Sequence, residues 1–135
     1  MHSISILGRP NVGKSTLFNR LIEERKAIVN STPGVTRDIN HGFLEWRDTT
    51  YLVYDTGGYT SLDEDSYAKM IRSNSLDLIA NGEFILLLLD FNEPANPDDD
   101  LLFSFIRKSA KPYAIVLNKG ERYQGHAFPA DFYRF

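Results

Sequence analysis

A short segment near the start of the chain combines two glycines with a lysine and a serine, in the order Gly8-Arg9-Pro10-Asn11-Val12-Gly13-Lys14-Ser15. This is the pattern G-x-x-x-x-G-K-[ST], in which a glycine-rich loop presents successive backbone N–H groups to an anion. The lysine adds a positive charge toward β- and γ-phosphates, and the serine hydroxyl is a hard oxygen ligand suited to Mg²⁺. The segment therefore predicts a phosphate-binding loop, formed by Gly8, Asn11, Val12, Gly13, Lys14, Ser15 and Thr16.

The sequence on either side of this loop supplies the context that the pattern requires. Ile4-Ser5-Ile6-Leu7 predicts a buried strand, and residues 16–22 predict a helix with its apolar residues on one side. A glycine-rich turn before a helix can be a mere chain reversal. The strand and the helix together favour the phosphate-binding loop, because the helix N-terminus adds further N–H groups to the anion site.

Two more segments could act on a bound phosphate. Asp55-Thr56-Gly57-Gly58 follows an apolar strand and gives D-x-x-G, where the carboxylate of Asp55 can hold Mg²⁺ through water and the N–H of Gly58 can reach a γ-phosphate. Thr36, in a segment rich in turn-forming residues, offers a hydroxyl that could complete the Mg²⁺ ligands. Alone, each is more often a plain turn or a solvated threonine, but both gain weight after a phosphate-binding loop.

A third segment, Asn118-Lys119-Gly120-Glu121, resembles the base-recognition pattern N-K-x-D. The amide of Asn118 can bond a base edge and buttress the phosphate loop, and the stem of Lys119 can cover the ring. A carboxylate accepts from N1–H and the exocyclic amine of guanine, which adenine does not offer in that arrangement. Glu121 stands where aspartate is expected and is one methylene longer, so both a guanine contact and a simple turn stay open.

These segments lie among alternating strands and helices. Strands are predicted at 4–7, 42–47, 51–54, 84–90 and 111–117, and helices at 16–22, 63–80 and 99–109. The fold class is therefore α/β, a mostly parallel sheet with helices on both faces. A hairpin turn at Asp48-Thr49-Thr50 predicts one antiparallel edge strand. Leu76 is expected on the apolar side of its helix, Trp46 in the core or on the sheet, and Asp98-Asp99-Asp100 at a solvated helix start.

Composition sets further bounds. The chain has 135 residues, 42% hydrophobic and 24% charged, with a net charge of −3 and no cysteine. One domain with a sizeable core is expected. The longest apolar run is too short for a membrane span, no signal peptide is visible, and the charge argues against direct DNA binding. These features predict a cytoplasmic protein without a membrane partner.

Taken together, the loop, the segment Pro33-Gly34-Val35-Thr36-Arg37-Asp38 and the sequence Asp55-Thr56-Gly57-Gly58-Tyr59 resemble the Era-like, translation-factor-related GTPases, and within them the first G domain of the Der (EngA) family. The resemblance implies a P-loop G domain that binds GTP or GDP with Mg²⁺ and hydrolyses GTP. It also implies a full-length protein that acts in assembly of the large ribosomal subunit. Family G domains continue into one more strand and helix, so residues 1–135 are expected to be a single, C-terminally incomplete G domain.

The resemblance also implies residue roles. Turnover would depend on Asn11, Lys14, Thr36 and Gly58; Mg²⁺ would be held by Ser15, Thr36 and Asp55; guanine would be framed by Asn118, Lys119 and Glu121. Asn11 would help bind a K⁺ ion that bridges the phosphates. Tyr59 replaces the water-orienting glutamine of many small GTPases, so a slow intrinsic rate, aided by K⁺ and a partner, is expected. Two alternatives stay open: a nucleotide-binding module with little turnover, and a P-loop ATPase or kinase.

Overall fold

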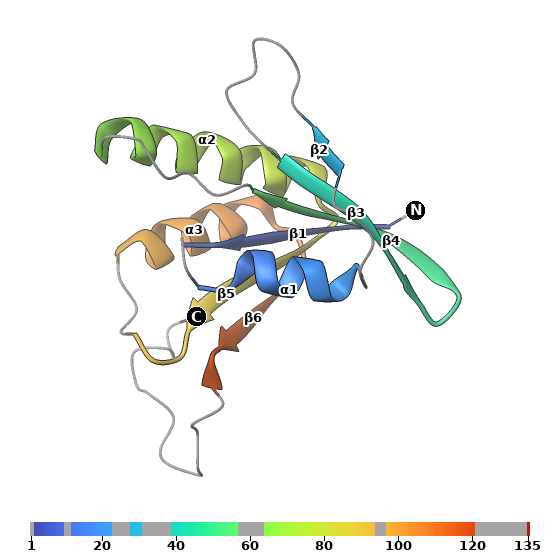
Figure 1. Ribbon diagram of the computed structural model, residues 1–135. Coiled ribbons are helices and arrows are strands. Elements are labelled where there is room, and N and C mark those ends of the chain that lie inside the picture. Colours follow the sequence, from blue (N-terminus) through green and yellow to red (C-terminus); the bar gives the residue numbers. More distant parts are fainter. Residues whose placement is uncertain are drawn as a thin grey trace.

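The computed structural model describes residues 2–9, 12–22, 28–30, 39–56, 64–93, 97–120 and 135 (Figure 1). The strands are β1 (His2–Gly8), β2 (Ile28–Asn30), β3 (Ile39–Trp46), β4 (Thr49–Thr56), β5 (Phe84–Asp90) and β6 (Tyr113–Asn118). The helices are α1 (Lys14–Leu21), α2 (Glu64–Asn81) and α3 (Pro97–Ser109). The strands form one sheet in the order β2-β3-β4-β1-β5-β6. No helix in these ranges is long and apolar enough to cross a bilayer.

The central part of the sheet is parallel. β1 pairs in parallel with β4 on one side and β5 on the other, and β5 pairs in parallel with β6. A parallel strand covered on both faces requires apolar residues on both sides. The apolar run in β5 meets this need, since Ile85, Leu87, Leu88 and Leu89 are all fully buried. The strand predicted at 84–90 is confirmed at those bounds.

Two helices cover one face of the sheet and one covers the other (Figure 1). Leu87 and Leu89 of β5 pack in one core cluster with Leu78 of α2 and Ile106 of α3. The intervening Leu88 packs instead in a second cluster, which contains Ile6, Val12, Phe18, Ile22 and Val53. Successive side chains of a strand point to opposite faces. The predicted α/β class with helices on both faces is therefore confirmed.

The antiparallel edge differs in detail from the prediction. β3 and β4 form a hairpin whose turn is Arg47-Asp48, with φ of 48° and 63°, and Thr49 and Thr50 already belong to β4. Two consecutive left-handed residues are the geometry of a type I′ turn, which matches the twist of the strands. The turn predicted at Asp48-Thr49-Thr50 is thus misplaced toward the C-terminus. β2 pairs antiparallel with β3, so the antiparallel edge has a second, three-residue strand.

Two large apolar side chains, Leu76 and Trp46, are exposed. Leu76 of α2 is 46% exposed, whereas Leu78 and Ile79 on the same helix are buried. Trp46 is 58% exposed at the end of β3, where the guanidinium of Arg47 lies over its ring. The prediction for Leu76 was wrong, because a hydropathy pattern does not reveal that the helix turns this side chain outward. Trp46 lies on the sheet, which is one of the two places predicted for it.

Candidate functional site

The phosphate-binding loop lies between the end of β1 and the start of α1. Gly13 is the N-cap of α1, with φ of 103°, and its carbonyl accepts the N–H of Leu17 at 3.0 Å. Gly13 has no side chain to cap this N-terminus, and the first turn of α1 carries no acidic residue. The first N–H groups of the helix can therefore serve an anion, which the helix dipole also favours.

Both glycines of the loop pattern are required by close packing. A Cβ on Gly8 would lie 2.8 Å from Cγ2 of Val12 and 2.9 Å from the backbone oxygen of Leu88. A Cβ on Gly13 would lie 2.1 Å from Nδ2 of Asn118, at a φ that favours glycine. The loop is thus wedged between β5 and the end of β6, which fixes its shape.

Lys14 and Asp55 bring opposite charges to this region. Asp55 lies near the end of β4 and is fully buried, next to β1 in the sheet. Burial lowers the pKa of the Lys14 ammonium, and the negative charge of Asp55 opposes that effect. The lysine is therefore a partly desolvated cation whose charge a bound phosphate would stabilise.

The described oxygens suit a Mg²⁺ ion shared with phosphates. Ser15 and Thr16 are exposed at the start of α1, and Asp55 supplies a buried carboxylate. No group of three or more histidine, cysteine, aspartate or glutamate side chains is placed to hold a metal in the described part of the chain. At nucleotide sites Mg²⁺ uses few protein oxygens together with those of the phosphates, and Ser15 and Asp55 carry oxygens of that kind.

Asn118 joins the base-recognition segment to the phosphate loop. It is the last residue of β6, and its Nδ2 donates to the backbone oxygen of Val12 at 2.8 Å. The predicted buttress is thus present in the structure. Because the bond reaches the middle of the loop, the end of β6 and the phosphate loop are held at a fixed spacing.

The turn after β5 holds Lys119 in place. Its Nζ lies 3.3 Å from Oδ2 of the buried Asp90, and its backbone oxygen accepts Nδ2 of Asn92 at 2.7 Å. The N–H of Phe91 donates to the oxygen of Asn118 at 2.8 Å. Lys119 itself has φ of 64°, so these contacts maintain a backbone conformation that a lysine rarely adopts. We call residues 90–93 the β5 turn.

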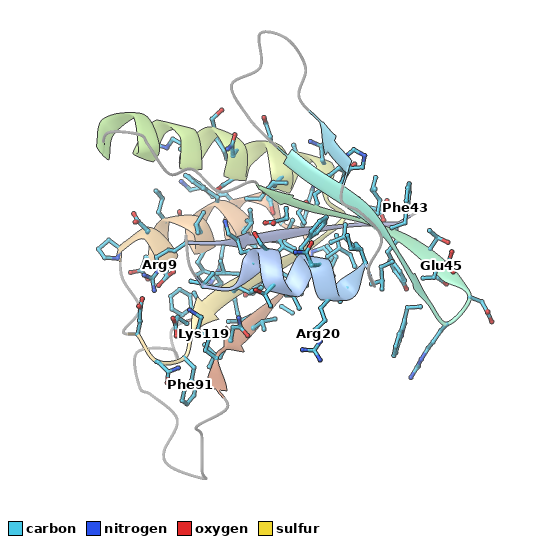
Figure 2. All side chains as sticks on the ribbon, viewed as in Figure 1. Arg9, Arg20, Phe43, Glu45, Phe91 and Lys119 are labelled. Carbon is cyan, nitrogen blue, oxygen red and sulfur yellow. The ribbon has the colours of Figure 1, made fainter. Side chains whose placement is uncertain are left out.

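The described site residues lie at or just after the ends of β1, β4 and β6 and at the start of α1. Figure 2 labels Lys119, which follows β6. The remaining predicted site residues, Asn11, Thr36, Gly58 and Glu121, lie outside the described residues, and so does Tyr59.

One contact at this rim was not predicted. The side chain of Asp99 is completely buried and its Oδ1 accepts Nε of Arg9 at 2.8 Å. The aspartate run was expected to be solvated throughout, and for Asp99 that expectation was wrong. Its burial depends on β1 lying near α3, which the local sequence does not encode; an arginine inside the phosphate loop was the only signal available.

A phosphate loop at the end of a central parallel strand, with an Asn-Lys pair two strands away and bonded to it, defines a P-loop nucleotide-binding domain of the G-domain class. Residues 3–119 match the model of the family described as 50S ribosome-binding GTPase. The chain belongs to this family, as the sequence resemblance indicated.

Relatives and solved structures agree with this assignment. GTPase Der of Trichlorobacter lovleyi is 42% identical over 132 residues, which is 96% of this chain and 29% of the relative. GTPase Der of Flavobacterium psychrophilum is 42% identical over 130 residues, 96% of this chain and 30% of the relative. The chain thus spans under a third of the length of these curated relatives.

Among solved structures, Aquifex aeolicus Era bound to GDP.AlF4- has a TM-score of 0.69 and 28% identity, covering 89% of this chain and 41% of that one. The G domain of the T. maritima FeoB iron transporter has a TM-score of 0.61 and 29% identity, covering 87% and 71%. The likeness to Era and FeoB supports the predicted G-domain fold.

Proposed function

We propose that this chain binds guanine nucleotide and hydrolyses GTP to GDP and phosphate, as the switch domain of a larger protein. The observation that carries the proposal is the hydrogen bond from Asn118 to the backbone of Val12. This bond fixes the distance between the base-recognition segment and the phosphate loop. A nucleotide site needs such a fixed distance, because the base and the phosphates of one nucleotide are covalently joined. A loop that bound only inorganic phosphate would not need this link.

In the proposed reaction, water attacks the γ-phosphate in line with the departing GDP. Lys14 and the N–H groups at the start of α1 hold the phosphates and offset the charge that develops on them. Ser15, with Thr36 and Asp55, would hold Mg²⁺, which supplies charge neutralisation when it is bound. Asn11 would help hold K⁺, and Gly58 would donate to the γ-phosphate in the GTP state. Release of the segments around Thr36 and Gly58 after hydrolysis would make the switch.

The proposed partner of the full-length protein is the large ribosomal subunit or its precursor, in the cytoplasm. The family description, 50S ribosome-binding GTPase, and the similarity to GTPase Der support this partner. A structural neighbour, Era, has been solved in complex with MgGDPNP and nucleotides of 16S ribosomal RNA. The test is co-sedimentation of the full-length protein with large ribosomal subunits, measured once with a non-hydrolysable GTP analogue and once with GDP. The amount that sediments is expected to differ between the two nucleotides. Equal sedimentation in both states would contradict a switch.

The first test of nucleotide specificity is a titration with fluorescent GDP in Mg²⁺, competed separately by GTP and ATP. Selective displacement by GTP is expected. Equal displacement by ATP would instead favour a P-loop ATPase or kinase. Lys14→Ala is expected to remove GTP hydrolysis while circular dichroism stays that of the parent, and an unchanged rate would contradict the proposed role of Lys14.

A second candidate is a guanine-nucleotide module with little turnover, favoured by Tyr59 and Glu121 in place of the usual glutamine and aspartate. Single-turnover hydrolysis in K⁺ and in Na⁺ separates the two candidates. A phosphate burst stimulated by K⁺ supports the GTPase. Tight GDP binding without any burst supports the module.

A further inference from the structure

Arg9, the second residue of the phosphate loop, turns away from the phosphate side and toward α3. Its Nε donates to Oδ1 of Asp99 at 2.8 Å, and the side chains of Arg9 and Asp99 are 11% and 0% exposed. Figure 2 shows Arg9 beside the start of α3. Because the guanidinium is buried against this carboxylate, it does not serve as a cation for the nucleotide in this arrangement.

Arg9 has a second acidic neighbour on the β5 turn. Its Nη1 lies 3.4 Å from Oε2 of Glu93, whose own N–H donates to the backbone oxygen of Asp90 at 3.2 Å. Burial by itself would lower the pKa of Arg9, but the hydrogen bond and charge of Asp99, with those of Glu93, raise it above the usual value. The guanidinium is therefore a permanent charge with a fixed orientation.

These contacts connect the phosphate loop to the base-recognition segment by way of the β5 turn. Asp90 and Asn92 of the β5 turn hold Lys119, a residue of the base-recognition segment, while Glu93 of the same turn contacts Arg9. On the other side, Asn118 holds the loop at Val12. The loop is thus anchored at positions 9 and 12, and the two anchors bracket Pro10 and Asn11 in the sequence.

A buried ion pair is a poor way to gain stability. Desolvation of two charges offsets most of their attraction, and well-packed apolar residues of similar size often serve as well or better. What arginine adds is direction, since its planar group presents Nε to Asp99 and Nη1 to Glu93 in one fixed arrangement. The pair is therefore better suited to fixing the position of the loop than to holding the domain together.

We propose that Arg9 and Asp99 are positioning residues that hold the phosphate loop in its nucleotide-binding shape and, through Glu93 and the β5 turn, link it to the base-recognition segment. The inference rests on the proposed function. It predicts that replacing the pair by apolar residues separates stability from nucleotide handling.

The experiment compares Arg9→Met, Asp99→Leu and the double variant with the parent chain. Each single variant removes the Arg9–Asp99 contact from one buried charged group and is expected to lower the melting temperature. The double variant is expected to recover a melting temperature close to that of the parent. Its release of fluorescent GDP is nevertheless expected to stay about tenfold faster or more, because small displacements of a binding group have effects of this size. Recovery of both properties would overturn the proposal.

The chain offers a matched control and a second route. Asp98→Leu changes the same charge one residue earlier on α3, at an exposed position, and is expected to leave GDP release unchanged. Arg9→Lys keeps the charge but loses the fork, so it tests the proposal even if the double variant fails to fold. Its melting temperature is expected near that of the parent, with faster GDP release. Parent-like release from Arg9→Lys would overturn the proposal.

Different results would overturn the proposed function and the role of Arg9 and Asp99. A parent chain that binds no GDP in Mg²⁺ would overturn the proposed function and this inference with it. A parent chain that binds GDP, accompanied by an Arg9→Lys variant that releases it at the same rate, would overturn the inference alone.

Discussion

Gly13→Ala tests whether the phosphate loop and the base-recognition segment depend on one another. The new Cβ would lie 2.1 Å from Nδ2 of Asn118 and would sit on a residue with φ of 103°. No real Cβ is found so close to a nitrogen, so either Asn118 moves or the loop does. In both cases the hydrogen bond from Asn118 to Val12 is lost.

The magnitude follows from two contributions. A left-handed backbone costs alanine about 1–2 kcal/mol relative to the conformations it prefers. Loss of one hydrogen bond costs about 1 kcal/mol. The sum is about 2–3 kcal/mol. If the loop keeps its shape, this amount is subtracted from the free energy of unfolding. If the loop shifts, it is subtracted from nucleotide binding, and GDP affinity falls by about 30- to 150-fold.

Two measurements on the same protein cover both cases. Urea denaturation gives the change in the free energy of unfolding, and titration with fluorescent GDP gives the change in affinity. The two losses together are expected to reach about 2–3 kcal/mol. Gly120→Ala is the control, because its Cβ would lie 3.8 Å from the ring of Phe91, an ordinary contact. Parent-like stability together with parent-like affinity in Gly13→Ala would refute the reasoning.

Three further predictions concern charge, helix termination and packing. Burial lowers the pKa of Lys14 in the free chain. Because phosphates bind the charged lysine, GDP affinity measured in EDTA is expected to fall as pH rises through that lowered pKa. A GDP affinity that does not change with pH would contradict this prediction. The Nζ of Lys111 donates to three backbone oxygens at the end of α2, so Lys111→Met is expected to lower the free energy of unfolding by about 1–2 kcal/mol. An equal loss in the exposed control Lys108→Met would show that these hydrogen bonds do not stabilise the end of α2. Leu78→Ala is expected to cost about 2–5 kcal/mol in urea denaturation, whereas Leu76→Ala, at a side chain 46% exposed, is expected to cost under about 0.5 kcal/mol; equal losses would contradict the packing described.

Much of the fold could be predicted because its signals are local. The apolar run of β5 bounded by polar residues located a buried strand, and the glycine-lysine pattern located a loop between a strand and a helix. The bond from Asn118 to the loop was also predictable, since parallel strands place their carboxyl ends at one edge of the sheet.

What could not be predicted depends on contacts between distant segments. Asp99 is separated from Arg9 by 90 positions, and nothing in three consecutive aspartates indicates that the middle one is buried. The hairpin turn was predicted one residue too late, at Asp48-Thr49-Thr50, because Arg47 is neither a glycine nor an asparagine, the usual signals of left-handed φ. The roles proposed for Asn11, Thr36, Gly58 and Glu121 stay predictions, because these residues lie outside the described part of the chain.

The central place of β1 has a consequence for the order in which the domain is made. The strand that carries the phosphate loop is synthesised before the other described strands, yet its neighbours in the sheet are β4 and β5, with Ile4 opposite Val53 on one side and Phe84 on the other. Contacts of such long sequence separation form slowly and late. The hydrogen bond that braces the loop also forms late in synthesis, because Asn118 lies 106 positions after Val12 in the sequence. A nascent chain therefore carries its complete glycine-lysine motif long before Asn118 can brace the binding site, and nucleotide can stabilise this site only after β6 has been made.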